Sequence, residues 1–348
     1  DNSNGQWPSP NGILIMKQFF QTRAVVALFA VLFLSACGLP QSDQPRVWNT
    51  APGPYQVKHV DALVLNDAGQ DRDVQMQVSY PVGKGTFPVV VFSHGAFCYP
   101  QNYRAITDFW VSNGYVVVAL DHLDSPNLGK INPRVLPILQ EARAKDLSFV
   151  LDSLDDIEVS IPEFAGKLDR ERFAVAGHSF GGMISEVMVG APITRPDGEV
   201  VSYADERFDA AVIISGVGPA TMVDKSRLTE AAFDSINRPL FASGGTLDTG
   251  NVGTREQFPW EWRMSPYTLS PPEDKYSLVL ENGDHYLGGE ICRPNRGGDN
   301  DPQGVEIVRV LNTAFLDAYV KNDSAAKEFL RTVDVSSITS GRAALEYK

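Results

Sequence analysis

Apolar runs alternate with amphipathic stretches along most of the chain, and their spacing predicts the elements of the fold. Two segments in which apolar and polar residues alternate, 56–66 and 73–80, predict an antiparallel pair of strands. Continuous apolar runs are typical of strands buried in a parallel sheet, and they occur at 88–93, 115–122, 172–176, 208–216, 238–245 and 275–283. We expect the run at 275–283 to be the final strand.

Helical stretches separate these strands, at 101–113, 134–156, 183–189 and 305–320. In the closing stretch the apolar side chains repeat at helical spacing and form one face, made of Val305, Val308, Leu311, Phe315 and Tyr319. Strands that alternate with helices predict a doubly wound, mostly parallel α/β sheet. We expect one catalytic domain over 55–348, with its functional loops at the carboxyl ends of the strands.

The N-terminal region has the pattern of an export signal and not of the fold. Lys17 and Arg23 precede an apolar run at 24–34, which is shorter than the roughly 20 residues that a membrane span needs. We expect a signal peptide over 16–36 and a tether over 37–54. The alternative is an uncleaved anchor. Residues 1–15 lack an initial Met and are interpreted as an upstream, non-native segment.

The end of this signal, Leu34-Ser35-Ala36-Cys37, resembles the lipobox of bacterial lipoproteins. The resemblance implies that Cys37 is lipidated and becomes the first mature residue. Gly38 follows it, where lipoproteins retained in the inner membrane commonly carry Asp. We therefore expect an exported protein anchored to the bacterial envelope, on the periplasmic side of the outer membrane if the source is Gram-negative.

Composition and net charge restrict the classes of partner that the protein can bind. The 348 residues are 43% hydrophobic and 21% charged, which is typical of a globular protein with a sizeable core. The formal net charge of −13 argues against nucleic acid as a partner, because phosphates require a basic surface. The sequence has neither paired cysteines nor spaced histidines for a metal, and no Walker-type loop, so we expect no metal and no cofactor. We also expect a monomer.

The segment Gly177-His178-Ser179-Phe180-Gly181 matches the G-x-S-x-G pattern. It lies between the apolar run 172–176 and the helical stretch 183–189, as it does in a nucleophile elbow, where a serine occupies a strained strand-to-helix turn. Gly177 and Gly181 are needed there because a side chain would clash with the neighbouring strand or helix. The alternative is an ordinary turn without chemistry.

A serine nucleophile requires a base and an acid that orients the base. Of the five histidines, only His285 follows Ser179, just past the last predicted strand. Asp248 follows the strand 238–245 and is the predicted acid. Asp284 is adjacent to His285 and poorly placed to reach its ring. The alternatives are a surface-loop histidine and an aspartate in an ordinary turn.

The oxyanion of an acyl-transfer reaction requires two N–H donors. We expect them from Phe180, the residue after the nucleophile, and from Ala96, in the loop after 88–93. Gly95 allows that loop to turn tightly, and His94 is interpreted as structural and not catalytic.

These motifs resemble a known family. GHSFGG with an upstream FSHG is similar to the platelet-activating-factor acetylhydrolase and dienelactone-hydrolase-like branch of the α/β-hydrolases, and GTLDT resembles the acid loop of bacterial cutinases and polyester hydrolases. The resemblance covers most of residues 55–320 and implies a serine esterase. Dienelactone hydrolases have cysteine in place of Ser179. Plasma acetylhydrolases carry the acid after the preceding strand, whereas residues 214–218 contain no carboxylate. This difference favours Asp248 and leaves phospholipid specificity open.

Several aromatic residues follow the predicted acid, in the long connection 250–274. Phe258, Trp260, Trp262 and Tyr267 there, with Phe97 and Tyr99 from the oxyanion loop, are candidates for lining a pocket for a small or lipid-like ester. Alternatively, they pack the connection onto the body. The predicted function is ester hydrolysis, and the alternatives are a lipase or polyester hydrolase and a non-catalytic envelope lipoprotein.

Two further cysteines remain: Cys98 lies on the oxyanion loop, and Cys292 lies seven residues past His285. If the triad forms, both loops flank Ser179, which brings the two cysteines to one rim of the site. We therefore hypothesise a disulfide between them, which an exported compartment permits. The alternative is two separate thiols.

Overall fold

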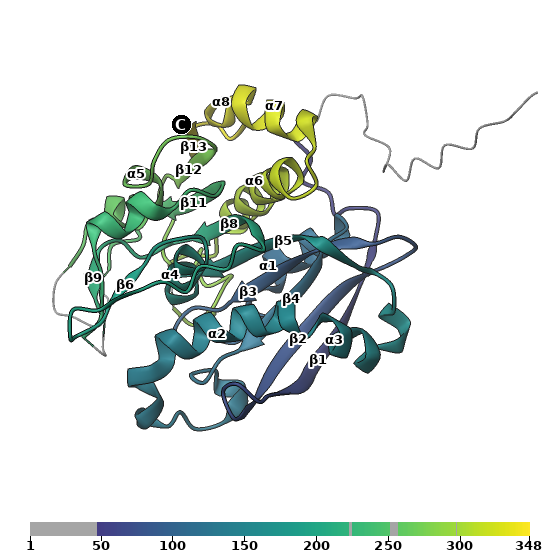
Figure 1. Ribbon diagram of the computed structural model, residues 1–348. Coiled ribbons are helices and arrows are strands. Elements are labelled where there is room, and N and C mark those ends of the chain that lie inside the picture. Colours follow the sequence, from purple (N-terminus) through teal and green to yellow (C-terminus); the bar gives the residue numbers. More distant parts are fainter. Residues whose placement is uncertain (1–46, 223–224, 251–256, 297) are drawn as a thin grey trace, which may run out of the picture. The chain divides into compact units, whose positions relative to one another are not determined.

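The computed structural model describes residues 47–222, 225–250, 257–296 and 298–348 (Figure 1). The predicted segments 1–15 and 16–36, together with Cys37 and the tether up to residue 46, lie outside these residues. Part of the aromatic connection, residues 251–256, also lies outside them. In the described part of the chain, no helix has both the length and the apolar character that crossing a membrane requires.

A nine-stranded sheet in the order β1-β2-β4-β3-β5-β8-β11-β12-β13 forms the centre of the fold. Neighbours from β4 to β12 run parallel, and the pairs β1–β2, β2–β4 and β12–β13 are antiparallel. The strands are β1 Gln56–Asp67, β2 Arg72–Val82, β3 Phe87–Ser93, β4 Val116–Asp121, β5 Leu168–His178, β8 Phe208–Ile214, β11 Leu240–Gly245, β12 Lys275–Leu280 and β13 Ala343–Tyr347. This arrangement confirms the predicted doubly wound, mostly parallel sheet.

Helices cover both faces of the sheet, and each face has its own buried cluster of apolar side chains (Figure 1). Leu147 of α2 and Met183 of α4 belong to one cluster, and Trp110 of α1 and Leu311 of α6 to the other. Strands between two such layers are covered on both sides, and every residue of β3 and β4 is accordingly buried. This burial explains why the sequence of such strands is a nearly continuous apolar run. The helices are α1 Arg104–Ser112, α2 Leu139–Asp152, α3 Leu154–Ser160, α4 Phe180–Met188, α5 Ser265–Thr268, α6 Pro302–Tyr319, α7 Ser324–Thr332 and α8 Val335–Ile338.

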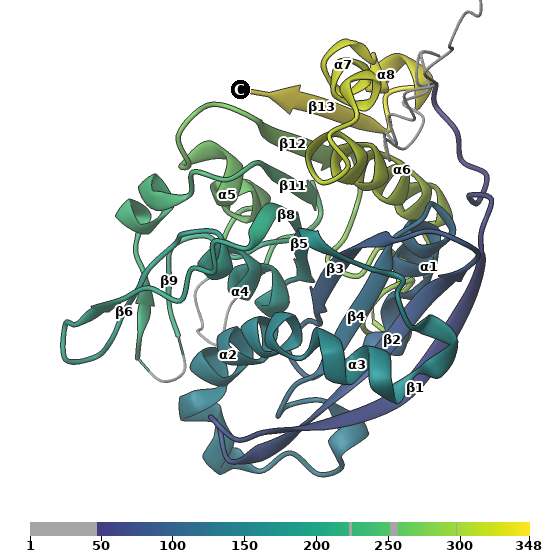
Figure 2. The ribbon, with the colours of Figure 1, turned by 45° about the vertical axis from the view of Figure 1, so that its right-hand side comes forward.

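Three expected features differ in the structure, and one small sheet was not predicted. The stretch 134–156 is not one helix: a 3-10 helix at Pro133–Ile138 precedes α2, and Ser153 separates α2 from α3. The run 275–283 is not the final strand, because β13 pairs with β12 at the sheet edge (Figure 2). The helix 305–320 is followed by α7 and α8. Two-residue strands also form a small second sheet, which comprises β6 Ile193–Thr194, β7 Val200–Val201, β9 Ala220–Thr221 and β10 Arg227–Leu228.

Candidate active site

The segment around Ser179 forms a sharp turn between β5 and α4. Ser179 has φ 55° and ψ −117°, a conformation that side chains rarely adopt and that functional sites often retain. A Cβ on Gly177 would overlap the carbonyl of Gly181, and a Cβ on Gly181 would overlap the carbonyl of Ser93. Both glycines are therefore required by close backbone approach, and the turn has the geometry of a nucleophile elbow.

The three residues predicted as a triad form one line of hydrogen bonds. Ser179 Oγ lies 2.9 Å from His285 Nε2, and His285 Nδ1 lies 2.9 Å from Asp248 Oδ1. Asp248 follows β11 and His285 follows β12, so all three residues come from the carboxyl ends of parallel strands. Asp284, the neighbouring carboxylate, instead accepts backbone N–H groups of Tyr286, Gly288 and Gly298 and organises the turn.

A buried arginine supports Asp248. Arg263 Nε donates to Asp248 Oδ1 at 3.1 Å, and its Nη1 donates to the carbonyl of Gly216 at 3.1 Å. Burial alone would raise the pKa of Asp248, but the charges and hydrogen bonds of His285 and Arg263 outweigh burial and hold this pKa well below its usual range. Asp248 is therefore a carboxylate, as the orienting acid of a triad must be.

The two predicted oxyanion donors lie on either side of Ser179. Phe180 is the first residue of α4, where a backbone N–H has no partner inside its own helix. In the described part of the chain, the N–H of Ala96 has no hydrogen-bond acceptor, whereas the neighbouring N–H groups of Gly95 and Phe97 are bonded to Tyr103 Oη and Asp124 Oδ2. The loop thus leaves one N–H available where the prediction places a donor.

An ion pair that the sequence did not suggest holds this loop. Arg143 of α2 binds Asp124 through Nη2 at 2.7 and 2.8 Å, and its Nη1 donates to the carbonyl of His94 at 2.5 Å. Its guanidinium also lies 4.5 Å from the ring centre of Phe180. Asp124 in turn accepts the N–H of Phe97 at 2.9 Å. One buried arginine therefore contacts both segments that supply the predicted donors.

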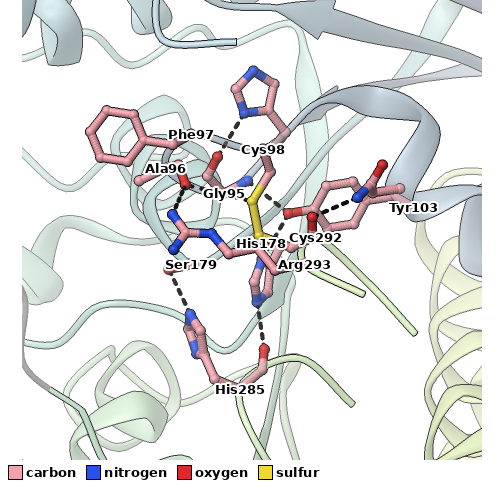
Figure 3. The surroundings of a disulfide bond; sticks show 12 residues. Gly95, Ala96, Phe97, Cys98, Tyr103, His178, Ser179, His285, Cys292 and Arg293 are labelled. Atoms are coloured by element: carbon pink, nitrogen blue, oxygen red, sulfur yellow. Dashed lines mark hydrogen bonds between the residues drawn. A yellow bond between two sulfur atoms is a disulfide. The ribbon is translucent and has the colours of Figure 1, made fainter. Parts of the chain in front are cut away.

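His178 connects the oxyanion loop with the loop of the base (Figure 3). Burial lowers the pKa of His178 well below its usual range, so the ring is neutral. Its Nε2 lies 2.9 Å from the carbonyl oxygen of His285, which can only accept, so Nε2 carries the proton. Its Nδ1 then accepts from Tyr103 Oη at 2.9 Å, and Tyr103 Oη accepts the N–H of Gly95. The chain of bonds fixes the two loops against each other.

The structure also joins these loops covalently, by a disulfide between Cys98 and Cys292 whose Cα atoms are 5.2 Å apart (Figure 3). Asn102 Nδ2 donates to the carbonyl of Cys292 at 2.6 Å, beside the same bridge. Three connections therefore fix the position of Ala96 relative to His285: the disulfide, the hydrogen bonds through His178, and the bond from Asn102 to Cys292.

We expect the double variant Cys98→Ala/Cys292→Ala to unfold at lower urea concentration and to turn over esters more slowly. A bridge between residues 194 apart in sequence restricts the unfolded chain, which contributes roughly 5 kcal/mol in the chain-entropy model. The measurement is urea unfolding with and without reductant. Reductant should destabilise the wild type and leave the variant unchanged, whereas two alkylatable thiols at these positions in the non-reduced protein would contradict the bridge.

A cavity of about 400 Å³ opens onto Ser179 and His285. Apolar side chains dominate its lining, among them Phe97, Leu136, Leu139, Phe180, Val217 and Met222. Of the aromatic residues predicted to line it, Phe97 does so, whereas Tyr99, Trp260 and Trp262 are not among its lining residues. Trp262 instead stacks on Phe258 at 4.4 Å and donates to the carbonyl of Pro219 at 3.1 Å. Trp262 and Phe258 thus pack onto the body, which is the alternative considered from the sequence for these aromatic residues, whereas Gly250 and Arg263 of the same connection line the cavity.

A second serine, histidine and aspartate are bonded in the same way beneath the oxyanion loop. Ser93 Oγ lies 2.9 Å from His122 Nε2, and His122 Nδ1 lies 2.8 Å from Asp146 Oδ2. None of the three side chains is exposed to solvent. Burial raises the pKa of Asp146 to about 6, although the charge of Arg72 opposes the shift. No ester can reach Ser93, so this set supports the loop.

Two comparisons with known proteins gave matches. A family model described as Chlorophyllase matches residues 46–189, which include the elbow and end before Asp248 and His285. The platelet-activating factor acetylhydrolase of Canis lupus familiaris is 24% identical over 237 residues, which cover 57% of this chain and 47% of that protein. Those of Bos taurus and Cavia porcellus are 28% and 29% identical over 134 and 132 residues, in each case 28% of this chain and 30% of the relative.

The chain has the α/β-hydrolase fold. The matched relatives belong to the branch that the sequence motifs resemble, that of the platelet-activating factor acetylhydrolases. The chain spans less than half of the length of these relatives. The family match covers Ser179 and the oxyanion loop, so the assignment of acid and base depends on the geometry described above.

Sequence reasoning missed four residues of this site, Arg143, Arg263, Tyr103 and Arg293. A signal exists for the first: Arg143 lies four residues from both Leu139 and Leu147, on the apolar face of α2, where a charged residue requires a buried partner. The other three bond to partners that are 15 to 197 residues away in sequence: Arg263 to Asp248, Tyr103 to His178 and Arg293 to the carbonyl of Ala96. Nothing in their local sequence marks these contacts.

Proposed function

We propose that the hydrolase cleaves carboxylic esters by a Ser-His-Asp mechanism with an acyl-enzyme intermediate. Ser179 Oγ attacks the ester carbonyl while His285 Nε2 takes its proton, and Asp248 stabilises the resulting imidazolium. The N–H groups of Ala96 and Phe180 bind the oxyanion. His285 returns the proton to the departing alcohol, and water then releases the acyl group with His285 again as the base.

The observation that carries the proposal is the pair of hydrogen bonds that join the three side chains beside a largely apolar cavity. Ser179 Oγ lies 2.9 Å from His285 Nε2, and His285 Nδ1 lies 2.9 Å from Asp248 Oδ1. A lone serine has no means to lose its proton near neutral pH, whereas one bonded to an oriented imidazole does. The names of the relatives refer to an acetyl group, and we extend this to the hydrolase by proposing short acyl chains.

Two measurements test this function. A fluorophosphonate probe should label the purified protein at Ser179 only, and a series of p-nitrophenyl esters from acetate to palmitate should be turned over best at its short end. Fastest turnover of the palmitate would favour a lipase or polyester hydrolase. Absence of both labelling and turnover would leave a non-catalytic lipoprotein, the other alternative.

We further propose that the hydrolase is exported and anchored to the envelope through a lipid on Cys37. Support comes from the basic residues, the short apolar run and the lipobox-like Leu34-Ser35-Ala36-Cys37 that the sequence places together. We expect Cys37→Ser to leave the precursor uncleaved or to release the protein from membranes, because the thiol is the group to which the lipid is attached. Fractionation and a metabolic fatty-acid label measure this, and unchanged processing and membrane association would rule the anchor out.

A further inference from the structure

The charged side chains that line the cavity beside Ser179 are positive. Among the described residues that line it, Arg263 and Arg293 are charged, and none is an aspartate or glutamate. Arg263 is bound to the Asp248 carboxylate, so its charge is neutralised within the triad. The remaining charge in an otherwise apolar lining is the guanidinium of Arg293.

Arg293 is held over the oxyanion loop with most of its donors unused. Its Nη2 donates to the carbonyl of Ala96 at 3.0 Å, which places the guanidinium beside the loop that supplies the predicted donor (Figure 3). Within the described residues Arg293 forms no ion pair, and its side chain is partly exposed. A guanidinium has five N–H donors in a planar fork, so one bond to a carbonyl leaves the others available.

This arrangement is unusual in a protein with a net charge of −13, where acidic partners are plentiful. A planar guanidinium binds a carboxylate or phosphate with two parallel hydrogen bonds, which are stronger than bonds between neutral groups. We infer that Arg293 makes this site selective for esters that carry a second, anionic group in addition to the ester bond. The inference rests on the proposed esterase function and specifies its class of substrate.

Arg293 has a second conceivable effect, which the experiment must separate from the first. Through the Ala96 carbonyl it also positions the oxyanion loop, and that effect is the same for every ester. Selectivity is therefore measured as the ratio of kcat/KM for two esters that differ in one negative charge, because a shared effect on the loop cancels in that ratio.

The two sides of the ester are tested with two matched pairs. On the alcohol side, p-acetoxybenzoate is compared with its methyl ester. On the acyl side, mono-p-nitrophenyl adipate is compared with p-nitrophenyl hexanoate. The pair that responds identifies the side of the ester that faces Arg293.

The variants are Arg293→Gln, which removes the charge and keeps an N–H donor for Ala96, and Arg293→Lys, which keeps the charge. Arg296→Gln is the control, because Arg296 is exposed, lies three residues away and does not line the cavity. Arg293→Gln should lower the ratio of anionic to neutral ester by about tenfold in at least one pair. Arg293→Lys should retain part of it, and Arg296→Gln should retain all of it.

Salt provides an independent readout. Raising the ionic strength should lower the ratio of kcat/KM for the anionic and the neutral ester more in the wild type than in Arg293→Gln, because both proteins repel the anion through their net negative charge but only the wild type has the guanidinium. Equal losses for both esters in Arg293→Gln, or a wild-type preference for the neutral member of each pair, would overturn the anionic subsite. Either result leaves the esterase function intact, whereas no turnover of any neutral ester by the wild type would contradict the esterase function itself.

Discussion

Replacing Ser179 with alanine should lower kcat for a short ester by about 10⁴- to 10⁶-fold, and His285→Ala should have an effect of the same order. The two residues act as one unit, since Ser179 Oγ is 2.9 Å from the only atom of His285 that can accept its proton. The double variant should therefore be little slower than either single variant. Initial rates with p-nitrophenyl acetate, at saturating substrate, measure this.

Both variants should fold, because the Ser179 hydroxyl bonds to His285, and Asp248 keeps its ion pair with Arg263 when the His285 ring is removed. Melting temperature and fluorophosphonate labelling are the controls: the melting temperature should stay close to that of the wild type, and labelling of Ser179→Ala should disappear. Near-normal turnover by folded Ser179→Ala would refute the proposed nucleophile.

Asp248→Asn should lower kcat by about 10⁴-fold with little change in KM, because an amide in this position favours the wrong tautomer of His285. In the native protein Asp248 Oδ1 accepts the proton of Nδ1 and leaves Nε2 free to act as base. The variant should also lose stability, since Arg263 is buried and would be left without a charged partner. Turnover and urea unfolding of the same preparation separate the two effects.

The matched control is Asp284→Asn, which changes the same functional group one residue from His285. Asp284 binds backbone N–H groups of its own turn and not the imidazole. We expect this variant to keep most of its activity. The reverse pattern, an active Asp248→Asn and an inactive Asp284→Asn, would show that the acid is the neighbouring carboxylate.

The central part of the fold could be predicted because long apolar runs have one stable environment, the interior of a parallel sheet. The elements that were missed lack such a pattern. β13 is an edge strand whose residues are mostly exposed, and its position depends on pairing with β12. The strands of the small sheet are two residues long and leave no periodic signal. Ser153 interrupts a stretch whose composition is helical throughout, so the break before α3 was not visible.

The candidate triad could be predicted because chain order and strand ends restrict the choice: His285 is the only histidine after Ser179, and Asp248 directly follows a strand. The residues that support the triad are set by tertiary contacts. Arg263 is 15 residues from Asp248 in sequence, and Tyr103 is 75 residues from His178. Spacing along the chain carries no information about such pairs.

The set Ser93, His122 and Asp146 has a consequence for how enzymes are recognised from coordinates. In the described part of the chain, hydrogen bonds join a serine, a histidine and an aspartate in two sets, and the interatomic distances in the two sets are nearly the same. Only one of them adjoins a cavity and an unused N–H donor. Interatomic distances alone therefore identify a hydrogen-bonded serine, histidine and aspartate but not a catalytic triad. A nucleophilic serine is distinguished from a buried structural one by whether the carbonyl carbon of a substrate can reach its oxygen.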